Sequence, residues 1–202
     1  MSQSHLCRWL AVPAGILATI LIAPSQTTRA QTVAGQAKAV QSTVFTLLGA
    51  SVTALADTGS LDGPTDARQA SQGTGRISSL FRGETLHATT IGWPDQVASE
   101  ASVAGIALNV AGTAIGADFV MSRARAAEGL PASGRTTIEG LSINGLAIPV
   151  TSEPNQTIAI PGGQLVINEQ RVSAAGATVN ALHLVVHGLA DVVVASATAN
   201  LR

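Results

Sequence analysis

The sequence predicts an all-β domain, most simply an antiparallel β-sandwich built from successive hairpins. The chain is rich in Val, Ile, Thr, Ala, Ser and Gly, and only 11% of its residues are charged. β-Branched residues favour pleated strands. Gly, Pro, Asn and Asp interrupt the chain about every ten residues, which is typical of short strands joined by tight turns. A second sheet would bury the apolar face of each hairpin, and a single rolled sheet or barrel is the alternative.

Residues 1–30 are expected to be a helical signal peptide that precedes this domain. Arg8 supplies a positive start, residues 6–23 are almost entirely apolar, and a small residue, Ala30, ends the polar stretch that follows. This order is typical of a leader that signal peptidase removes. An uncleaved anchor is the alternative, because the apolar run approaches the length of a membrane span. Residues 31–202 are then one β-rich, extracytoplasmic domain.

Removal of the leader would change both the redox chemistry and the charge of the chain. Cys7 is the only cysteine, so the mature chain would have no disulfide and no thiolate. Nine of the eleven basic residues would remain against twelve acidic ones, a net charge of −3. The charges are scattered, and nucleic-acid binding needs clustered Lys and Arg. We therefore expect a secreted, periplasmic or surface location, no cofactor, no membrane span after cleavage, and a cell-envelope polysaccharide or surface protein as partner.

Residues 141–148 carry the clearest hairpin signal. Asn144-Gly145 is the preferred dipeptide of a type I′ turn, because both of its residues need a positive φ. A two-residue loop pairs Ile143 with Leu146, so that the apolar side chains on the two strands fall on one face.

Residues 104–119 repeat this pattern around Ala111-Gly112. The register predicts the pairs Ala104–Phe119, Ile106–Ala117 and Leu108–Ile115. Further hairpins are predicted from residues 158–160 with 165–167, from 182–186 with 190–194, and within 77–91 around Arg82-Gly83.

The remaining segments are less regular. Residues 39–56 fit strand or helix, and their β-branched content favours strand. Residues 57–75 and 126–136 are predicted to be long exposed loops. The core is expected to hold Val, Ile, Leu and Ala around a few large anchors, namely Phe45, Phe81, Phe119 and Trp93.

Seven phrases along residues 31–202 resemble, in order, those of the bacterial choice-of-anchor P proteins. They occupy residues 56–61, 114–120, 138–150, 154–158, 166–170, 179–183 and 191–196. The polar and turn residues within them are Asp57, Gly59, Asp118, Asn144, Gly145, Asn155, Asn168, Glu169, Asn180, His183 and Asp191. The resemblance implies a secreted or surface-displayed bacterial domain whose tethering device varies between members, and it implies no activity. Some members of the family carry a C-terminal sorting tail, which this sequence, ending at Arg202, does not show. Covalent anchoring to the cell surface is therefore not expected.

His183 and His187 are the first candidates for chemistry, because a helix would place them on one zinc-binding face. Their neighbours are typical of a strand, where they would lie about 13 Å apart and not share an ion. A structural His183, hydrogen-bonded beside Asn180, is the favoured interpretation.

Three carboxylates, Asp57, Asp62 and Asp66, are candidate Ca²⁺ ligands in a loop, but the calcium-loop spacing is absent. Asp57-Thr58-Gly59 also resembles an aspartic-protease motif, yet only one copy exists, so we expect a turn in which Asp57 caps backbone amides. Trp93 is a candidate ligand contact.

The sequence therefore predicts a non-enzymatic envelope or extracellular protein. The alternative is an adhesin module that binds a polysaccharide or a protein. A hydrolase that uses two of Glu139, Glu153 and Glu169 is a third hypothesis, although nothing in their spacing selects a pair.

Overall fold

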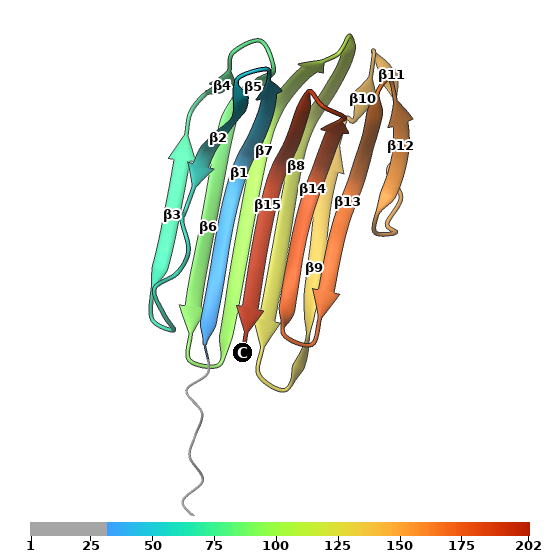
Figure 1. Cartoon of the computed structure of the whole chain (residues 1–202). Coiled ribbons are helices and arrows are strands. Elements are labelled where there is room, and N and C mark those ends of the chain that lie inside the picture. Colours follow the sequence, from blue (N-terminus) through green and yellow to red (C-terminus); the bar gives the residue numbers. More distant parts are fainter. Residues whose placement is uncertain (1–31) are drawn as a thin grey trace, which may run out of the picture. The chain divides into compact units, whose positions relative to one another are not determined.

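The computed structural model describes residues 32–202, which form strands joined by turns and loops (Figure 1). The predicted signal peptide, residues 1–30, lies outside the described residues. No helix in residues 32–202 has the length and apolar character needed to cross a membrane. The strands are β1 (Val33–Thr46), β2 (Gly49–Asp57), β3 (Ala67–Gln72), β4 (Gly75–Ile77), β5 (Phe81–Gly83), β6 (Thr85–Trp93), β7 (Gln96–Val110), β8 (Thr113–Ala127), β9 (Leu130–Glu139), β10 (Ser142–Ile143), β11 (Leu146–Ala147), β12 (Gln156–Ile160), β13 (Gly163–Ser173), β14 (Gly176–Val186) and β15 (Ala190–Leu201).

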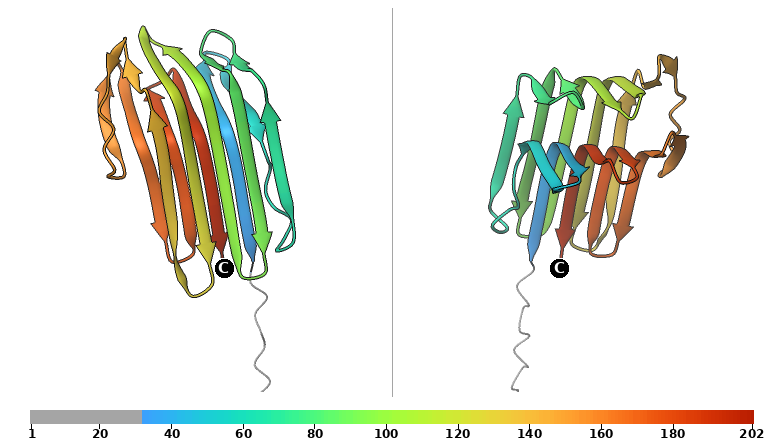
Figure 2. Two further views of the ribbon diagram at one scale, coloured as in Figure 1. Left: turned by 180° about the vertical axis from the view of Figure 1, so that it is seen from behind. Right: turned by 45° about the horizontal axis from the view of Figure 1, so that its top comes forward.

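The strands form two antiparallel sheets that lie face to face (Figure 2), so the predicted antiparallel sandwich is confirmed. One sheet has six strands in the order β12-β13-β14-β15-β1-β2. The other has nine strands around the long β7–β8 hairpin, with β6 and β5 beside β7 and with β9 and β10 beside β8. Their inner faces bury small and β-branched side chains, and Phe81 is the largest fully buried side chain of the described residues.

The turn signals predicted the strand pairing correctly. Ala104 pairs with Phe119, Ile106 with Ala117 and Leu108 with Ile115. Ile143 likewise pairs with Leu146, and Asn144 and Gly145 have φ angles of 51° and 78°, as a type I′ turn requires. The hairpins β12–β13 and β14–β15 also form where they were predicted.

One line across the six-stranded sheet breaks the regular alternation, and we call it the seam. Between β1 and β15 the ladder of paired residues passes from Lys38–Ser196 directly to Val40–Val194. Ala39 and Ala195 lie opposite each other there, as an extra pair that does not take part in the regular ladder. The same interruption occurs in every strand pair from β13 to β2. The extra residues are Ala39, Ala56, Asn168, Ala181 and Ala195, all of them buried.

Each extra residue at the seam acts as a β-bulge that is matched in the neighbouring strand. The φ angles of Ala56, Asn168 and Ala195, on alternate strands, are 46°, 53° and 53°. In the other sheet, Gly105 and Asp118 are passed over in the same way, and Gly105 has a φ of 59°. At the seam of the six-stranded sheet, two successive residues of each strand point inward. The outward side chains on either side of the seam are therefore three positions apart.

The structure corrects several predictions about loops. The segment 57–75 contains β3, and the segment 126–136 belongs largely to β8 and β9, because small polar residues such as Ser133 and Thr136 pair along a sheet edge. The turn within 77–91 is at Ser78–Leu80, not at Arg82-Gly83. Residues 39–56 are strand as favoured, but they form two strands around a turn at Leu47-Leu48.

The aromatic anchors are also corrected. Phe81 is buried, but Phe45 and Trp93 are 43% and 38% exposed, and Phe119 is half-buried. Phe119 faces outward because the extra pair Gly105–Asp118 shifts the alternation, whereas Phe45 and Trp93 occupy outward-facing positions near the ends of β1 and β6. The interior is therefore filled mainly by aliphatic side chains.

A buried polar link joins the two layers. The Ser99 hydroxyl on β7 donates to the carbonyl of Thr198 on β15 at 2.6 Å and bonds the Thr90 hydroxyl at 2.7 Å. We expect Ser99→Ala to lower the free energy of unfolding by about 1 kcal/mol, because two buried oxygen atoms lose a partner. Urea unfolding measures this, with Ser102→Ala on the outer face of β7 as the control. Equal stability of the two variants would contradict the prediction.

Candidate functional site

The candidate site lies on the outer face of the six-stranded sheet, at the seam. Asn180 and His183 are three residues apart on β14 and both point outward, because Ala181 and Leu182 are both buried between them. Glu169 on β13 is the register partner of Asn180. The seam therefore gathers three polar side chains that strict alternation would place on opposite faces.

Both ring nitrogens of His183 meet a carboxylate. Nδ1 lies 2.8 Å from Oε2 of Glu169, and Nε2 lies 3.1 Å from Oδ1 of Asp191 on β15. The Asn180 amide donates to the same Glu169 oxygen at 2.6 Å, and the Arg171 guanidinium donates to the other at 3.2 Å. Glu169 is therefore the centre of the cluster, and its side chain is only 12% exposed.

The surroundings of Glu169 favour its ionised form. Burial alone would raise the pKa of this carboxyl group, since a charge is poorly solvated there. The hydrogen bond from Asn180 and the nearby His183 outweigh burial, with a smaller contribution from Arg171, and they lower the pKa of Glu169 below its usual value. Glu169 is thus a carboxylate near neutral pH.

This arrangement suits a fixed polar network better than acid–base catalysis. A catalytic imidazole needs one nitrogen directed at a substrate or a nucleophile, with the other oriented by a carboxylate. Here both nitrogens of His183 are directed at carboxylates. The imidazole ring of His183 lies between the carboxylates of Glu169 and Asp191. It therefore occupies the space in which a glycosidase would hold the sugar and a water molecule.

The network continues as a polar row along the seam. In register across the sheet lie Glu169, Asn180, Ser196, Lys38 and Asp57. The Lys38 ammonium is 2.6 Å from Oε1 of Gln41 and 3.7 Å from Oδ2 of Asp57. The row thus has a carboxylate at each end and a cation near each carboxylate.

The three candidate Ca²⁺ ligands do not converge. Asp62 and Asp66 both bind Arg68. The backbone amide of Asp62 and, to a lesser extent, Arg68 lower the pKa of Asp66. Asp57 instead accepts from the amide of Gly59 and the side chain of Gln36, both at 2.9 Å. Asp57 therefore caps a turn, as predicted, and no set of three or more His, Cys, Asp or Glu residues suited to a metal occurs within residues 32–202.

The other polar residues of the seven phrases support turns. The Asn144 side chain accepts from the amide of Ala114 at 2.9 Å, and that of Asn155 accepts from the amide of Gln170 at 3.0 Å. The Asn168 amide donates to the carbonyl of Glu153 at 3.3 Å, which ties the loop before β12 to the seam. Asp118 is exposed on β8, beside the left-handed Gly140.

A second polar surface covers the outer face of the nine-stranded sheet. Trp93 lies opposite Gln96, whose side chain accepts from Arg125 at 2.7 Å. Arg123 binds Glu100 and is the register partner of Arg135 on β9. We call Trp93, Arg123, Arg125 and Arg135 the arginine face; its three guanidinium groups have Glu100 as their one ion-pair partner in the described part of the chain.

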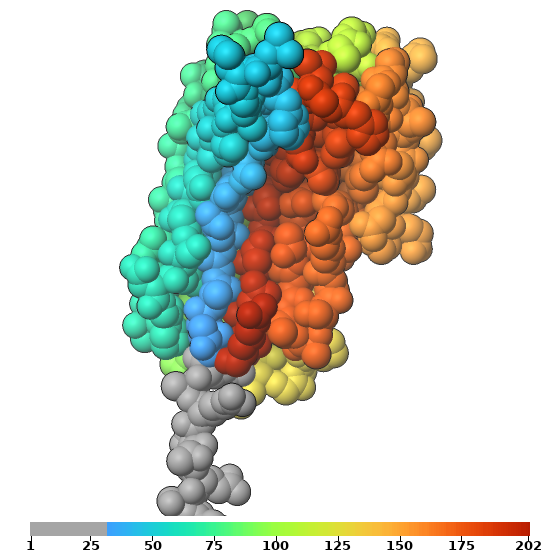
Figure 3. All heavy atoms as spheres, viewed as in Figure 1, coloured from blue at the N-terminus to red at the C-terminus, as the bar shows by residue number. Residues whose placement is uncertain are grey.

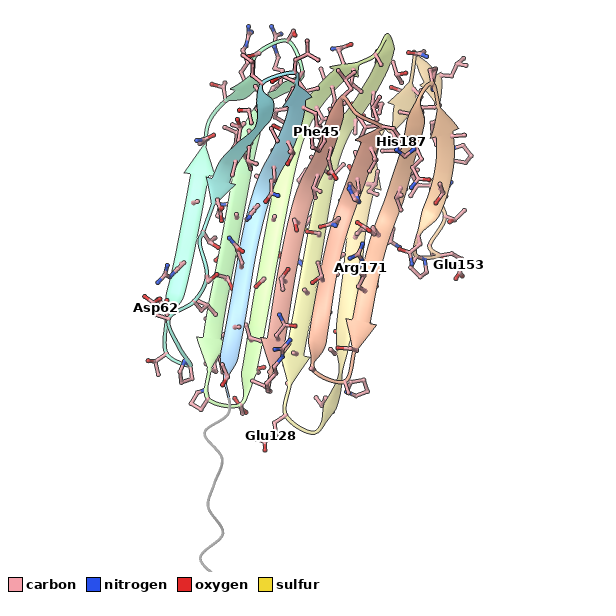
Figure 4. All side chains as sticks on the ribbon, in the orientation of Figure 1. Phe45, Asp62, Glu128, Glu153, Arg171 and His187 are labelled. Carbon is pink, nitrogen blue, oxygen red and sulfur yellow. The ribbon has the colours of Figure 1, made fainter. Side chains whose placement is uncertain are left out.

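His187 and a hollow between two turns add no converging groups. His187 is exposed at the β14–β15 turn, well above Arg171 on the same sheet (Figure 4), so it is separate from the network of His183. A hollow of about 740 Å³ lies between the β8–β9 and β13–β14 turns. Glu128 is the titratable residue in its lining, which otherwise consists of small and apolar residues such as Pro131 and Val172.

Sequence reasoning singled out Glu169, Asn180, His183 and Asp191 and placed His183 beside Asn180, but it did not identify Glu169 and Asp191 as the partners of His183. A signal for their proximity was present, because outward residues recur three positions apart in neighbouring strands: Lys38 and Gln41, Val166 and Glu169, Asn180 and His183, Val193 and Ser196. This shared spacing marks the seam.

Comparison with known proteins finds no matching family model, no matching curated protein and no matching solved structure.

Proposed function

We propose that this chain is a secreted or surface-associated bacterial β-domain with a non-enzymatic structural or interaction role in the cell envelope or extracellular space. The observation that supports it is the engagement of both nitrogens of His183 by Glu169 and Asp191. The most elaborate polar cluster of the domain thereby stabilises the sheet. The leader-like residues 1–30 and the resemblance to choice-of-anchor P proteins support the location.

Two measurements test this proposal. The full chain is expressed in a bacterial host, and the mass of the product outside the cytoplasm is determined. Loss of residues 1–30 supports export, whereas retention of the whole chain inside the cell contradicts it. The purified product is then assayed against a panel of glycosides and peptides. Hydrolysis that disappears in His183→Ala would overturn the non-enzymatic role.

A second candidate is a module that binds an acidic polysaccharide, and the arginine face favours it. Arg123 and Arg135 lie directly opposite each other, which is unfavourable for like charges, and Glu100 pairs with Arg123 alone, so Arg125 and Arg135 have no ion-pair partner within residues 32–202. Guanidinium groups bind carboxylate and sulfate groups, and a half-exposed tryptophan offers a flat surface for a sugar ring.

For this candidate, we expect Arg135→Gln to weaken binding to an acidic glycan about fivefold or more, because one charge-assisted contact is lost. A glycan array and titration calorimetry measure the effect. Arg171→Gln, on the opposite sheet, is the control and should bind like the parent chain. Equal affinity of Arg135→Gln and the parent would exclude the arginine face as the binding surface.

A further inference from the structure

Strand β2 is an open edge of the six-stranded sheet. It pairs with β1 on one side only, and five of its seven residues from Gly49 to Leu55 are exposed. Exposed edges normally carry charges, prolines or very short strands that prevent pairing with another chain. The other edges have such protection, with Arg68 on β3, Arg76 on β4 and Pro131 on β9, while β11 and β12 have two and five residues. Residues 49–56 contain neither charge nor proline.

The free backbone groups of β2 can be assigned from its register. The β1–β2 hairpin closes at the pair Thr46–Gly49, which is hydrogen-bonded in a two-residue loop. Because antiparallel pairs alternate, Ser51 and Thr53 also bond toward β1, whereas the N–H and C=O groups of Ala50, Val52 and Ala54 point away from it. Three donors and three acceptors are thus available along a straight edge.

Apolar side chains surround the same edge. Leu47 and Leu48 at the tip of the hairpin are fully exposed, and Val52 is 65% exposed. Phe45 lies beside them, and its amide bonds the carbonyl of Leu189 at 2.9 Å. Half of the exposed large hydrophobic side chains of residues 32–202 lie at this corner, which projects at the upper end of the sheet (Figure 3). Such a cluster is typical of an interaction surface.

We propose that this edge binds β2 of a second copy of the chain, as an antiparallel pair about a two-fold axis at Val52. Residues whose free groups face outward must meet one another, so Val52 pairs with its own counterpart and Ala50 with Ala54. The flanking pair is Ser51 with Thr53, and Gly49 meets Leu55. The two six-stranded sheets then join into one continuous sheet.

Charge favours a second copy over other occupants. A strand that meets its own copy fails when it carries a net charge, since like charges then face each other. Residues 49–56 carry none. Asp57, which follows them, is paired with Lys38. Asp191, which lies two strands away in register with Val52, is held by His183. An anionic lipid surface or an acidic peptide would need cations at this corner, whereas the named side chains here are aliphatic or aromatic.

Disulfide trapping tests the proposed register directly. Val52→Cys is introduced into the full chain together with Cys7→Ser, so that it is the only cysteine. Directly opposed residues of a hydrogen-bonded pair lie about 5.5 Å apart, which a disulfide can bridge. Mild oxidation should therefore convert most of the variant to a covalent dimer. Val172→Cys, also a half-exposed valine of this sheet, is the control and should remain largely monomeric. Equal trapping at the two positions would overturn the proposal.

The oligomeric state supplies a second test that needs no cysteine. In sedimentation analysis up to about 100 μM, the parent chain should form dimers. Val52→Lys should raise the dimer dissociation constant at least about tenfold, because two ammonium groups would meet at the axis. Val172→Lys should leave it unchanged, and circular dichroism verifies that each variant is folded. A monomeric parent, or assembly that continues beyond the dimer, would contradict pairing of β2 with itself. These results do not depend on the proposed extracellular role.

Discussion

Phe81→Ala is expected to lower the free energy of unfolding by about 3–5 kcal/mol, the largest effect of any single substitution considered. Phe81 is 2% exposed and begins β5, where it pairs with Leu108 of the central β7 strand. Its ring also packs against Gly83, since a Cβ atom added there would lie 3.0 Å from the tip of the ring and 3.0 Å from Val103. An alanine would leave a cavity that neighbouring aliphatic side chains cannot fill without breaking strand pairing.

Denaturant unfolding followed by far-ultraviolet circular dichroism measures this loss. Phe45→Ala is the matched control, because Phe45 is 43% exposed and should contribute less than about 1 kcal/mol to folding of the monomer. If the two substitutions destabilised the chain equally, Phe81 would not be the anchor of the interior.

Glu169→Ala is expected to destabilise the chain by about 2 kcal/mol at pH 7. The substitution removes the acceptor for Asn180, His183 and Arg171 at once, and it leaves the half-buried donors of the first two without a partner. The charge-assisted bonds of a nearly buried carboxylate are stronger than those between neutral groups.

The same substitution predicts a pH dependence. The pKa of Glu169 is lower in the folded chain than in the unfolded chain. Its ionised form therefore stabilises the fold fully above the unfolded pKa of about 4.3, and this stabilisation is lost as the pH falls through the lower, folded pKa. The stability difference between the parent and Glu169→Ala should hold at pH 5.5 and shrink toward pH 3.

Urea titrations across that pH range test both statements. Glu139→Ala removes an exposed carboxylate at the end of β9 and is the control, with an expected effect below about 0.5 kcal/mol. Glu169→Gln keeps an acceptor for Asn180 without the charge, so it should lie between the parent and Glu169→Ala at pH 7. A difference that stayed constant down to pH 3 would show that ionisation of Glu169 does not stabilise the sheet.

Turn chemistry made most of the strand pairing predictable. Asn144-Gly145 and Ala111-Gly112 set both the position of the turn and the register, because a two-residue loop leaves one pairing for the flanking strands. Where turns lacked such residues, the prediction of the turn was wrong. The turn at Leu47-Leu48 was missed because neither residue is polar or glycine, and the turn at Ser78–Leu80 was predicted too late in the chain, at Arg82-Gly83.

The candidate site was less predictable than the fold, for a physical reason. Strict alternation along β14 puts Asn180 and His183 on opposite faces, so no local rule joins them. They share a face because Ala181 adds one residue, and the neighbouring strands accept it only because each carries its own extra residue. Such a feature belongs to the sheet as a whole, and the sequence of one strand does not display it.

The seam also determines which changes of chain length this fold can accept. Deleting Ala195 alone would restore simple alternation in β15, with Ser196 still facing outward and Ala197 inward. It would, however, leave the extra residues Ala39 on β1 and Ala181 on β14 without a counterpart and shift every following pair by one position. A matching deletion in β14 and in β1 would be needed at the same time to recover the register. Single-residue insertions and deletions should therefore be tolerated in the turns but not in the strands, and lineages of this protein should keep their strand lengths in step.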